Sequence, residues 1–246
     1  MKLVLLGTAG YHPSDQRHTS CVFLPEIGVA FDAGTSFYRV RDRLVTSTLD
    51  VFLTHAHLDH AVGLTFLLNV VHGKGVTRTT VHGEDGKLSS LREHLFHPDL
   101  FPALPAIEWR PLRGELTLSD GGRLHYWPQR HPGGSLGYRI DWPDRSVALV
   151  TDTVADPDAD YVSHLRGVDL LIHECNFPDG QEAMAELTGH SCASPVAEVA
   201  RRAAVGRLVL THFDPLADPR VVPDLDRLRG IFPRTEVAYD NMAIEL

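Results

Sequence analysis

The chain has few cysteines, no long apolar run and no excess of positive charge. Its three cysteines, Cys21, Cys175 and Cys192, lack close paired spacing, which argues against a disulfide framework and against a thiolate zinc site. No apolar segment approaches the roughly 20 residues that cross a bilayer, and residues 1–7 predict a first strand rather than a signal peptide. A net charge of −9 gives no general attraction to nucleic acid. We therefore expect a cytoplasmic protein without a membrane partner.

Length and composition favour one α/β domain over residues 1–246. The sequence is 43% hydrophobic, enough to bury a large core. Runs rich in β-branched and aromatic residues predict strands at residues 3–6, 21–24, 29–32, 51–54, 79–82, 124–127, 138–140, 147–151, 170–173 and 208–211. Helical patterns lie at residues 61–71, 85–96, 195–204 and 223–231. The Pro-rich residues 97–111 are the candidate for an insertion or lid.

The densest chemical signal is the cluster of metal-binding side chains in residues 55–60. It holds His55, His57, Asp59 and His60. Crowded imidazoles repel one another when protonated and lose solvation when buried, unless a cation organises them. A strand ending at residue 54 would present His55 and His57 on one side of a loop, with Asp59 and His60 serving a second ion. Nitrogen and oxygen ligands suit zinc, manganese or iron(II), and two ions about 3.5–4 Å apart form a clamp for in-line displacement.

Other metal-binding or proton-transferring side chains stand where further predicted strands end. They are Asp32, His131, Asp152, His173 with Glu174, His190 and His212. Their shared position suggests strand ends that meet at one edge of a sheet, where α/β folds tend to build sites. A turn role is the alternative account of Asp152, and Asp32 fits either a turn or a brace for the metal-binding histidines.

These clusters are part of a series of motifs that runs through almost the whole chain. The motifs are Leu6-Gly7-Thr8-Ala9-Gly10, Phe31-Asp32-Ala33-Gly34, residues 55–60, His131 with Leu136-Gly137-Tyr138-Arg139, Thr151-Asp152-Thr153, His173-Glu174, Gly189-His190-Ser191 and Leu210-Thr211-His212-Phe213. In kind and order they resemble the metallo-β-lactamase-fold hydrolases, and within these the ribonuclease Z and related phosphodiesterase branch. The resemblance implies an αββα four-layer sandwich, two mixed β-sheets flanked by helices, with the metal ions at one edge.

The resemblance also implies a ligand set for two divalent ions. His55, His57 and His131 would hold one ion, Asp59, His60 and His212 the other, and Asp152 would bridge both. Zinc is the default, with manganese or iron as alternatives. A water bridging the two ions would have a pKa lowered to around 7 and would attack phosphorus as hydroxide.

Three residues are candidates for catalysis. A second oxygen of Asp59 could orient the hydroxide. His190 matches a family histidine near the scissile phosphate, where it could stabilise developing charge or protonate the leaving alkoxide. Glu174 could orient His190, although His173 and Glu174 could equally brace Asp32 or a backbone turn.

The expected substrate is a small or flexible phosphodiester, such as a cyclic phosphate, a nucleotide or an RNA-like chain. The arm with which ribonuclease Z grips transfer RNA would lie between His131 and Asp152, but only twenty residues separate the two here. No basic run replaces it, so we expect no strong nucleic-acid platform. Hydrolysis of a lactone or carboxylic ester by the same metal hydroxide is the alternative. A non-catalytic scaffold is a third hypothesis, against which the intact ligand set argues. Relatives are often dimers, so a homodimer is left open.

Two further patterns carry no function. Residues 133–137 match the G-x-S-x-G motif of serine hydrolases, but a strand, not a helix, is expected after Ser135. A cysteine nucleophile at Cys192 is also set aside, because Ser191 or Ser194 as a helix cap explains the polarity of that stretch.

Overall fold

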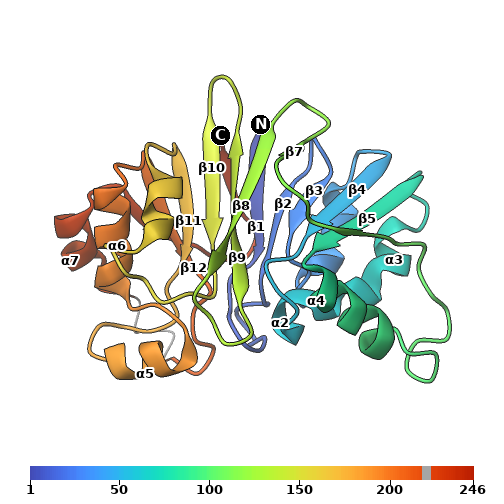
Figure 1. Ribbon diagram of the computed structural model, residues 1–246, viewed down its shortest axis with the longest axis horizontal. Helices are drawn as coiled ribbons and strands as arrows, with labels where there is room; N and C mark the ends of the chain where they lie inside the picture. The colour runs from blue at the N-terminus through green and yellow to red at the C-terminus, as the bar shows by residue number, and fades with distance from the viewer. Residues whose placement is uncertain (218–222) are drawn as a thin grey trace. The chain divides into compact units, whose positions relative to one another are not determined.

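The computed structural model describes residues 1–217 and 223–246, which divide into two compact units. The first unit comprises Met1–Gly114 and Tyr239–Glu245, and the second comprises Glu115–Ala238 with Leu246. Each unit is built on one seven-stranded mixed sheet that carries helices (Figure 1). The predicted class, two mixed sheets flanked by helices, is therefore confirmed, whereas a single domain over residues 1–246 stays a prediction.

In the first unit, short buried strands form the sheet that leads into the histidine cluster. Its order is β14 (Met242–Glu245), β1 (Lys2–Gly7), β2 (Cys21–Leu24), β3 (Val29–Phe31), β4 (Thr48–Phe52), β5 (Arg78–Gly83) and β6 (Glu108–Pro111). The strands from β3 to β6 run parallel. The carboxyl ends of β3 and β4 therefore lie at one edge, as the sequence motifs predicted.

The helices of this unit follow the strands and cover the apolar core. They are η1 (Phe37–Arg39), α1 (Val40–Arg43), α2 (Leu58–Ala61), η2 (Val62–Phe66), α3 (Leu67–Val71), α4 (Asp85–Ser90) and η3 (Leu91–Leu95). Leu64, Leu67 and Val70 are fully or almost fully buried in the same cluster as Val51 of β4. Asp59 and His60 on α2 are thus attached to a packed core.

The second unit is likewise built on one seven-stranded sheet with helices packed on it. Its order is β13 (Thr235–Val237), β12 (Arg207–Thr211), β11 (Leu170–Glu174), β10 (Ser146–Val150), β9 (Ser135–Asp141), β8 (Arg123–Gln129) and β7 (Leu116–Thr117). The strands from β10 to β13 are parallel, and β9 is antiparallel to both β8 and β10. The strands β8, β10, β11 and β12 therefore all end at the same edge.

The helices of the second unit are η4 (Asp160–Leu165), α5 (Glu182–Thr188), α6 (Ala193–Arg202) and α7 (Leu225–Ile231). Figure 1 shows α6 and α7 beside β11 and β12. Val196 and Val199 of α6 pack into the same core cluster as Leu171 and Leu208 of these strands. This packing holds the loop before α6, which contains His190, close to the strand ends.

Several details of the sequence prediction are wrong. The predicted strand 51–54 is β4, which ends at Phe52, and the predicted helix 61–71 is divided among α2, η2 and α3. The prediction omitted α5 and the strands β6, β7, β13 and β14; β6 lies inside the predicted insertion 97–111. Neither Ser191 nor Ser194 caps α6, because the N-cap residue is Cys192, without a side-chain cap.

Among the described residues, the model contains no helix with the length and apolar character needed to cross a bilayer. The cytoplasmic location stays a prediction.

Candidate metal centre

The loop after β4 gathers four metal-binding side chains in the first unit. His57 is the N-cap residue of α2, so the chain turns into a helix at that point and places Asp59 and His60 in its first turn. The ring centroids of His55 and His60 lie 4.3 Å apart, and those of His55 and His57 lie 4.4 Å apart. His55 and His60 are buried whereas His57 is exposed. In the predicted cluster, the imidazole of His55 therefore lies in contact with those of both His57 and His60.

Asp32 orients this loop from the end of β3. Its buried carboxylate accepts hydrogen bonds from the Thr54 amide at 2.8 Å and from the Thr54 hydroxyl at 3.0 Å. His60 Nδ1 lies 2.7 Å from Asp32 Oδ2. Because an ionised carboxylate can only accept, Nδ1 of His60 carries a hydrogen, and in the neutral ring Nε2 then presents a lone pair. Asp32 thus acts as a brace rather than only as a turn residue.

The lone pair of His60 faces a second carboxylate. His60 Nε2 lies 3.2 Å from Asp59 Oδ2, which also accepts the Tyr11 amide at 2.9 Å. Two acceptor atoms at this separation repel each other unless a cation or a proton lies between them. Two ligands of one tetrahedral zinc ion, each about 2.1 Å from it, lie roughly 3.4 Å apart. The spacing fits a shared divalent ion.

The second unit presents a matching arrangement around Asp152. Its carboxylate oxygens lie 3.2 Å from His212 Nε2 and 3.5 Å from His131 Nε2, and all three side chains are nearly fully buried. His131 Nδ1 lies 2.9 Å from the Gly189 carbonyl. That carbonyl can only accept, so Nδ1 of His131 carries a hydrogen, and in the neutral ring an Nε2 lone pair faces the carboxylate. This is the tautomer that a metal ligand needs.

His190 lies beside this group and is held by Glu174. Helix α5 ends with Gly189 in the left-handed conformation, φ 77°, and the amides of Gly189 and His190 both donate to the Ala185 carbonyl. This turn places His190 Nδ1 3.0 Å from Glu174 Oε1. One ligand atom each from Asp152, His190 and His212 lies within 4.8 Å of the others.

Glu174 is fully buried at the end of β11 and also organises the backbone. Its carboxylate accepts the amides of Thr153 at 2.9 Å, Ser191 at 3.1 Å and Asn176 at 3.2 Å. The two alternatives for Glu174, orienting His190 and bracing a turn, therefore coexist in its contacts. Its neighbour His173 is buried against the Tyr161 hydroxyl at 3.3 Å, and burial lowers the pKa of His173.

Left-handed backbone marks the strand ends that carry these residues. Asp32 has a φ of 59°, Asp152 of 50° and His212 of 58°. Such conformations are uncommon outside glycine and cost of order 1 kcal/mol or more, so they persist where the surrounding structure requires them. Tyr11, which donates to Asp59, has a φ of 56°. The sharp turns direct polar side chains to the strand ends without a glycine.

The donor set fits divalent metal ions. It consists of imidazole nitrogens and carboxylate oxygens. In His60 and His131, Nε2 faces a carboxylate and Nδ1 donates to another group. Zinc, manganese and iron(II) accept such ligands. The chemistry available at such a site is Lewis-acid activation of a phosphoryl or carbonyl group and of water.

Sequence reasoning missed three groups that position these side chains. Thr54 joins Asp32 to the cluster through its hydroxyl, the Gly189 carbonyl fixes His131, and the Tyr11 amide fixes Asp59. A glycine after the helical residues 182–188 was an available signal for the turn at Gly189. The backbone amides and carbonyls in the other contacts are groups that nearly every residue has, so the sequence pattern does not predict them.

Comparisons with known proteins agree with this description. The family model described as "Beta-lactamase superfamily domain" matches residues 29–213. Ribonuclease Z of Gemmatimonas aurantiaca is 31% identical over 306 aligned residues, covering 98% of this chain and 94% of the relative. Two solved structures cover 100% of this chain and 99% of their own. The metallo-beta-lactamase fold protein YhfI from Bacillus subtilis has a TM-score of 0.80 at 19% identity, and human tRNase Z, short form, has 0.75 at 23%.

The fold and these groups of imidazoles and carboxylates define a metal-dependent hydrolase that uses divalent ions. The chain belongs to the β-lactamase superfamily, in its ribonuclease Z-like branch, as the sequence motifs predicted.

Proposed function

We propose that this protein is a phosphodiesterase that uses two divalent metal ions, with zinc as the preferred ion, on a small or flexible phosphodiester. The observation that carries the proposal is the arrangement of the imidazoles. His60 and His131 each place Nδ1 within hydrogen-bond distance of a fixed acceptor and Nε2 3.2 Å and 3.5 Å from a carboxylate. This is the arrangement of a metal-ligating histidine, in which Nδ1 donates to a neighbouring acceptor and Nε2 binds the ion.

We assign the ligands on the family motifs. His55, His57 and His131 would hold one ion, Asp59, His60 and His212 the other, and Asp152 would contribute to both. When bound, the ions polarise a phosphoryl oxygen and lower the pKa of water, which makes a nucleophile available at neutral pH.

His190 is proposed as the general acid. Its Nδ1 is held by the buried Glu174 carboxylate at 3.0 Å, which keeps the ring in one orientation. Nε2 is then the atom that delivers a proton to the leaving oxygen. Glu174 acts through His190 as a positioning residue. Asp59, fixed by the Tyr11 amide at 2.9 Å, is proposed to orient the attacking water.

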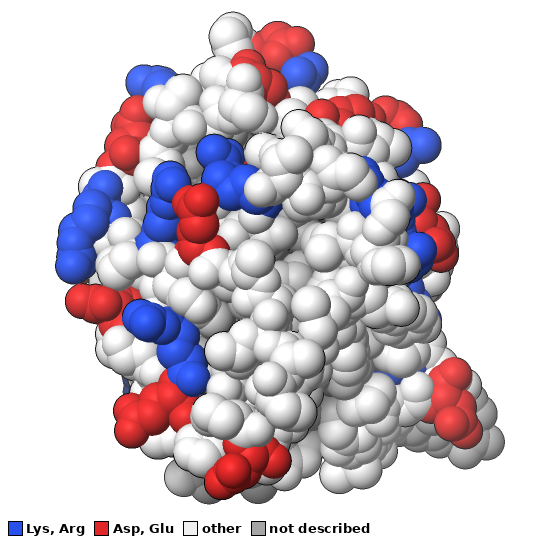
Figure 2. Space-filling model, turned by 90° about the vertical axis from the view of Figure 1, so that its right-hand side faces the viewer, with Lys and Arg blue, Asp and Glu red and all other residues white. Residues whose placement is uncertain are grey.

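The compactness of the chain supports a small or flexible substrate. The 306-residue alignment with the Gemmatimonas relative exceeds the 246 residues here, so at least 60 positions of the relative have no counterpart. Between His131 and Asp152 the chain forms only β9, a tight connection and β10. On the face shown in Figure 2, Lys and Arg alternate with Asp and Glu around an uncharged centre. These features argue against grip on a large folded RNA.

The test is a comparison of substrates with zinc or manganese supplied. Bis(p-nitrophenyl) phosphate, p-nitrophenyl acetate, a lactone and a precursor transfer RNA are offered to the wild type and to His190→Ala. We expect turnover of the phosphodiester, with His190→Ala lowering kcat by about 10²–10⁴. His164→Ala, in the same unit, is the control and should retain activity. Turnover of the acetate or lactone alone would show that the enzyme attacks a carbonyl carbon and not phosphorus. Cleavage of precursor transfer RNA much faster than of the small phosphodiester would overturn the small-substrate assignment.

A further inference from the structure

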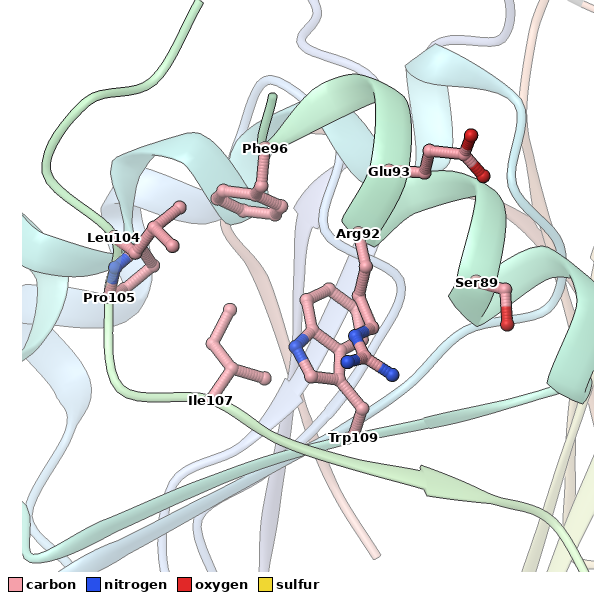
Figure 3. Close-up of a pocket in the computed structure, with 8 residues that line it drawn as sticks. All are labelled: Ser89, Arg92, Glu93, Phe96, Leu104, Pro105, Ile107 and Trp109. Atoms are coloured by element: carbon pink, nitrogen blue, oxygen red, sulfur yellow. The ribbon is translucent and has the colours of Figure 1, made fainter. Parts of the chain in front are cut away.

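A cavity lies in the first unit, and its lining includes none of the residues of the histidine cluster. It has a volume of about 560 Å³. Its lining comes from α4, η3 and the segment that leads into β6 (Figure 3), namely Ser89, Arg92, Glu93, Phe96, Leu104, Pro105, Ile107 and Trp109. The volume falls in the range of about 300–1,000 Å³ that small-molecule sites occupy.

The walls of this cavity are aromatic and fixed. Phe96 packs edge to face on Trp109 with ring centroids 5.8 Å apart, and on Phe101 at 5.2 Å. Phe96 is buried in the core of the unit, and Trp109 packs against that core while part of its ring stays accessible. Figure 3 shows Phe96, Leu104, Ile107 and Trp109 around the cavity. The cavity therefore presents aromatic and apolar surface to a planar ring.

One cation accompanies these rings. Figure 3 shows Arg92 on the Trp109 side of the cavity, whereas Ser89 and Glu93 point away from its apolar walls. Among the residues that the structure describes, no carboxylate lies within ion-pair distance of Arg92. The neighbouring arginine on β6, Arg110, is by contrast paired with Glu108 at 2.6 Å. Arg92 therefore offers its guanidinium to an anionic group on the Trp109 side of the cavity.

The strand register separates this cavity from the metal-binding loop of the same unit. Val51 of β4 is level with Val81 of β5, which is level with Trp109 of β6. The strand β4 ends at Phe52, and His55 follows beyond its carboxyl end. The residues at positions 104–107 precede β6 and so lie toward the opposite edge of the sheet. The cavity is therefore distinct from the histidine cluster.

We propose that this cavity binds a nucleotide, with the base against Trp109 and the apolar wall and the phosphate on Arg92. Aromatic side chains hold bases by their π-faces, independently of sequence. The planar guanidinium offers paired donors that match phosphate oxygens. The inference rests on the cavity alone and not on the proposed hydrolysis, so the two can fail separately.

The test is isothermal titration calorimetry of the full chain with AMP, adenosine and ribose 5-phosphate. AMP should bind at least about tenfold more tightly than either fragment, because it engages both the rings and Arg92. Arg92→Gln should weaken AMP about tenfold and leave adenosine unchanged. Arg110→Gln is the matched control and should bind AMP as the wild type does. Trp109→Leu should weaken AMP and adenosine alike.

Equal AMP affinity in wild type and Arg92→Gln, or no saturable AMP binding, would overturn the proposal. Trp109 also packs on the core, so its variant could fail to fold. In that case the result for Arg92→Gln alone decides the test. Hydrolysis of bis(p-nitrophenyl) phosphate is measured in parallel and should be unchanged in Arg92→Gln, which separates this site from the catalytic one. Tri-adenylate identifies the source of the nucleotide: tighter binding than AMP assigns an RNA strand, and weaker binding assigns a free nucleotide.

Discussion

Replacing Asp32 by asparagine should weaken metal binding by His60, a proposed ligand, through its hydrogen-bond partner and without changing His60 itself. The Asp32 carboxylate accepts from the Thr54 amide at 2.8 Å through Oδ1 and from His60 Nδ1 at 2.7 Å through Oδ2. Asparagine tolerates the left-handed backbone at this position, φ 59°, so the turn is kept. The change exchanges one acceptor for a donor and leaves the shape of the side chain almost unaltered.

The consequence follows from hydrogen positions. The Thr54 amide needs an acceptor, so the asparagine oxygen stays there and its NH₂ group faces His60 Nδ1. His60 must then accept at Nδ1 and carry its hydrogen on Nε2, which points at Asp59 Oδ2, 3.2 Å away. An Nε2 that carries hydrogen cannot bind a metal. We expect zinc affinity to fall 10–100-fold, about 1.4–2.8 kcal/mol, while the metal-free protein keeps its stability to within about 1 kcal/mol.

The assay is a competition titration of metal-free protein with zinc and a chromophoric chelator. Asp50→Asn is the matched control, because Asp50 Oδ1 pairs with His82 Nε2 at 2.8 Å in the same sheet, outside the cluster. It should leave zinc affinity unchanged. Unaltered affinity in Asp32→Asn, or an equal loss in Asp50→Asn, would refute the reasoning.

Three further changes test other parts of the structure. Asp240→Ala removes the partner of the largely buried Arg39, 2.6 Å away, and should lower the free energy of unfolding in urea by about 3 kcal/mol. Burial lowers the pKa of His173, so its contribution to stability is complete above the unfolded-state pKa of about 6.5 and is lost as the pH falls below it. The free energy of unfolding should therefore fall with decreasing pH between pH 7.5 and 5.5, and His173→Gln should reduce this dependence by up to about 1.4 kcal/mol per pH unit. Gly189→Ala would bring a Cβ within 2.4 Å of Pro132 and 2.9 Å of His131 Nδ1, so zinc titration should show weaker binding.

The sequence located the side chains of the site better than it located the elements that carry them. Apolar runs closed by Asp32, Asp152 and His212 were recognisable, because a buried strand followed by a polar residue is a strong pattern. Left-handed turns at these residues explain why no glycine was needed there. The predicted end of the strand before the cluster was wrong, because the apolar run continues past Phe52 into the loop, where Leu53 is also buried.

The elements that were missed are short or polar. The strand β7 has two residues and β13 has three, too few for an alternating pattern to stand out. The strand β6 ends in proline, which lowers a strand prediction except at a sheet edge, where β6 lies. Tertiary hydrogen bonds such as that from His131 to the Gly189 carbonyl join residues 58 positions apart and are invisible to local patterns.

The most direct test of the central claim is the initial rate of bis(p-nitrophenyl) phosphate hydrolysis by the zinc-loaded wild type beside Asp152→Ala. Asp152 is proposed to be shared by both ions, so its loss should abolish turnover while circular dichroism shows a folded protein. Turnover by the variant at the wild-type rate, or none by a fully metallated wild type, would contradict the account.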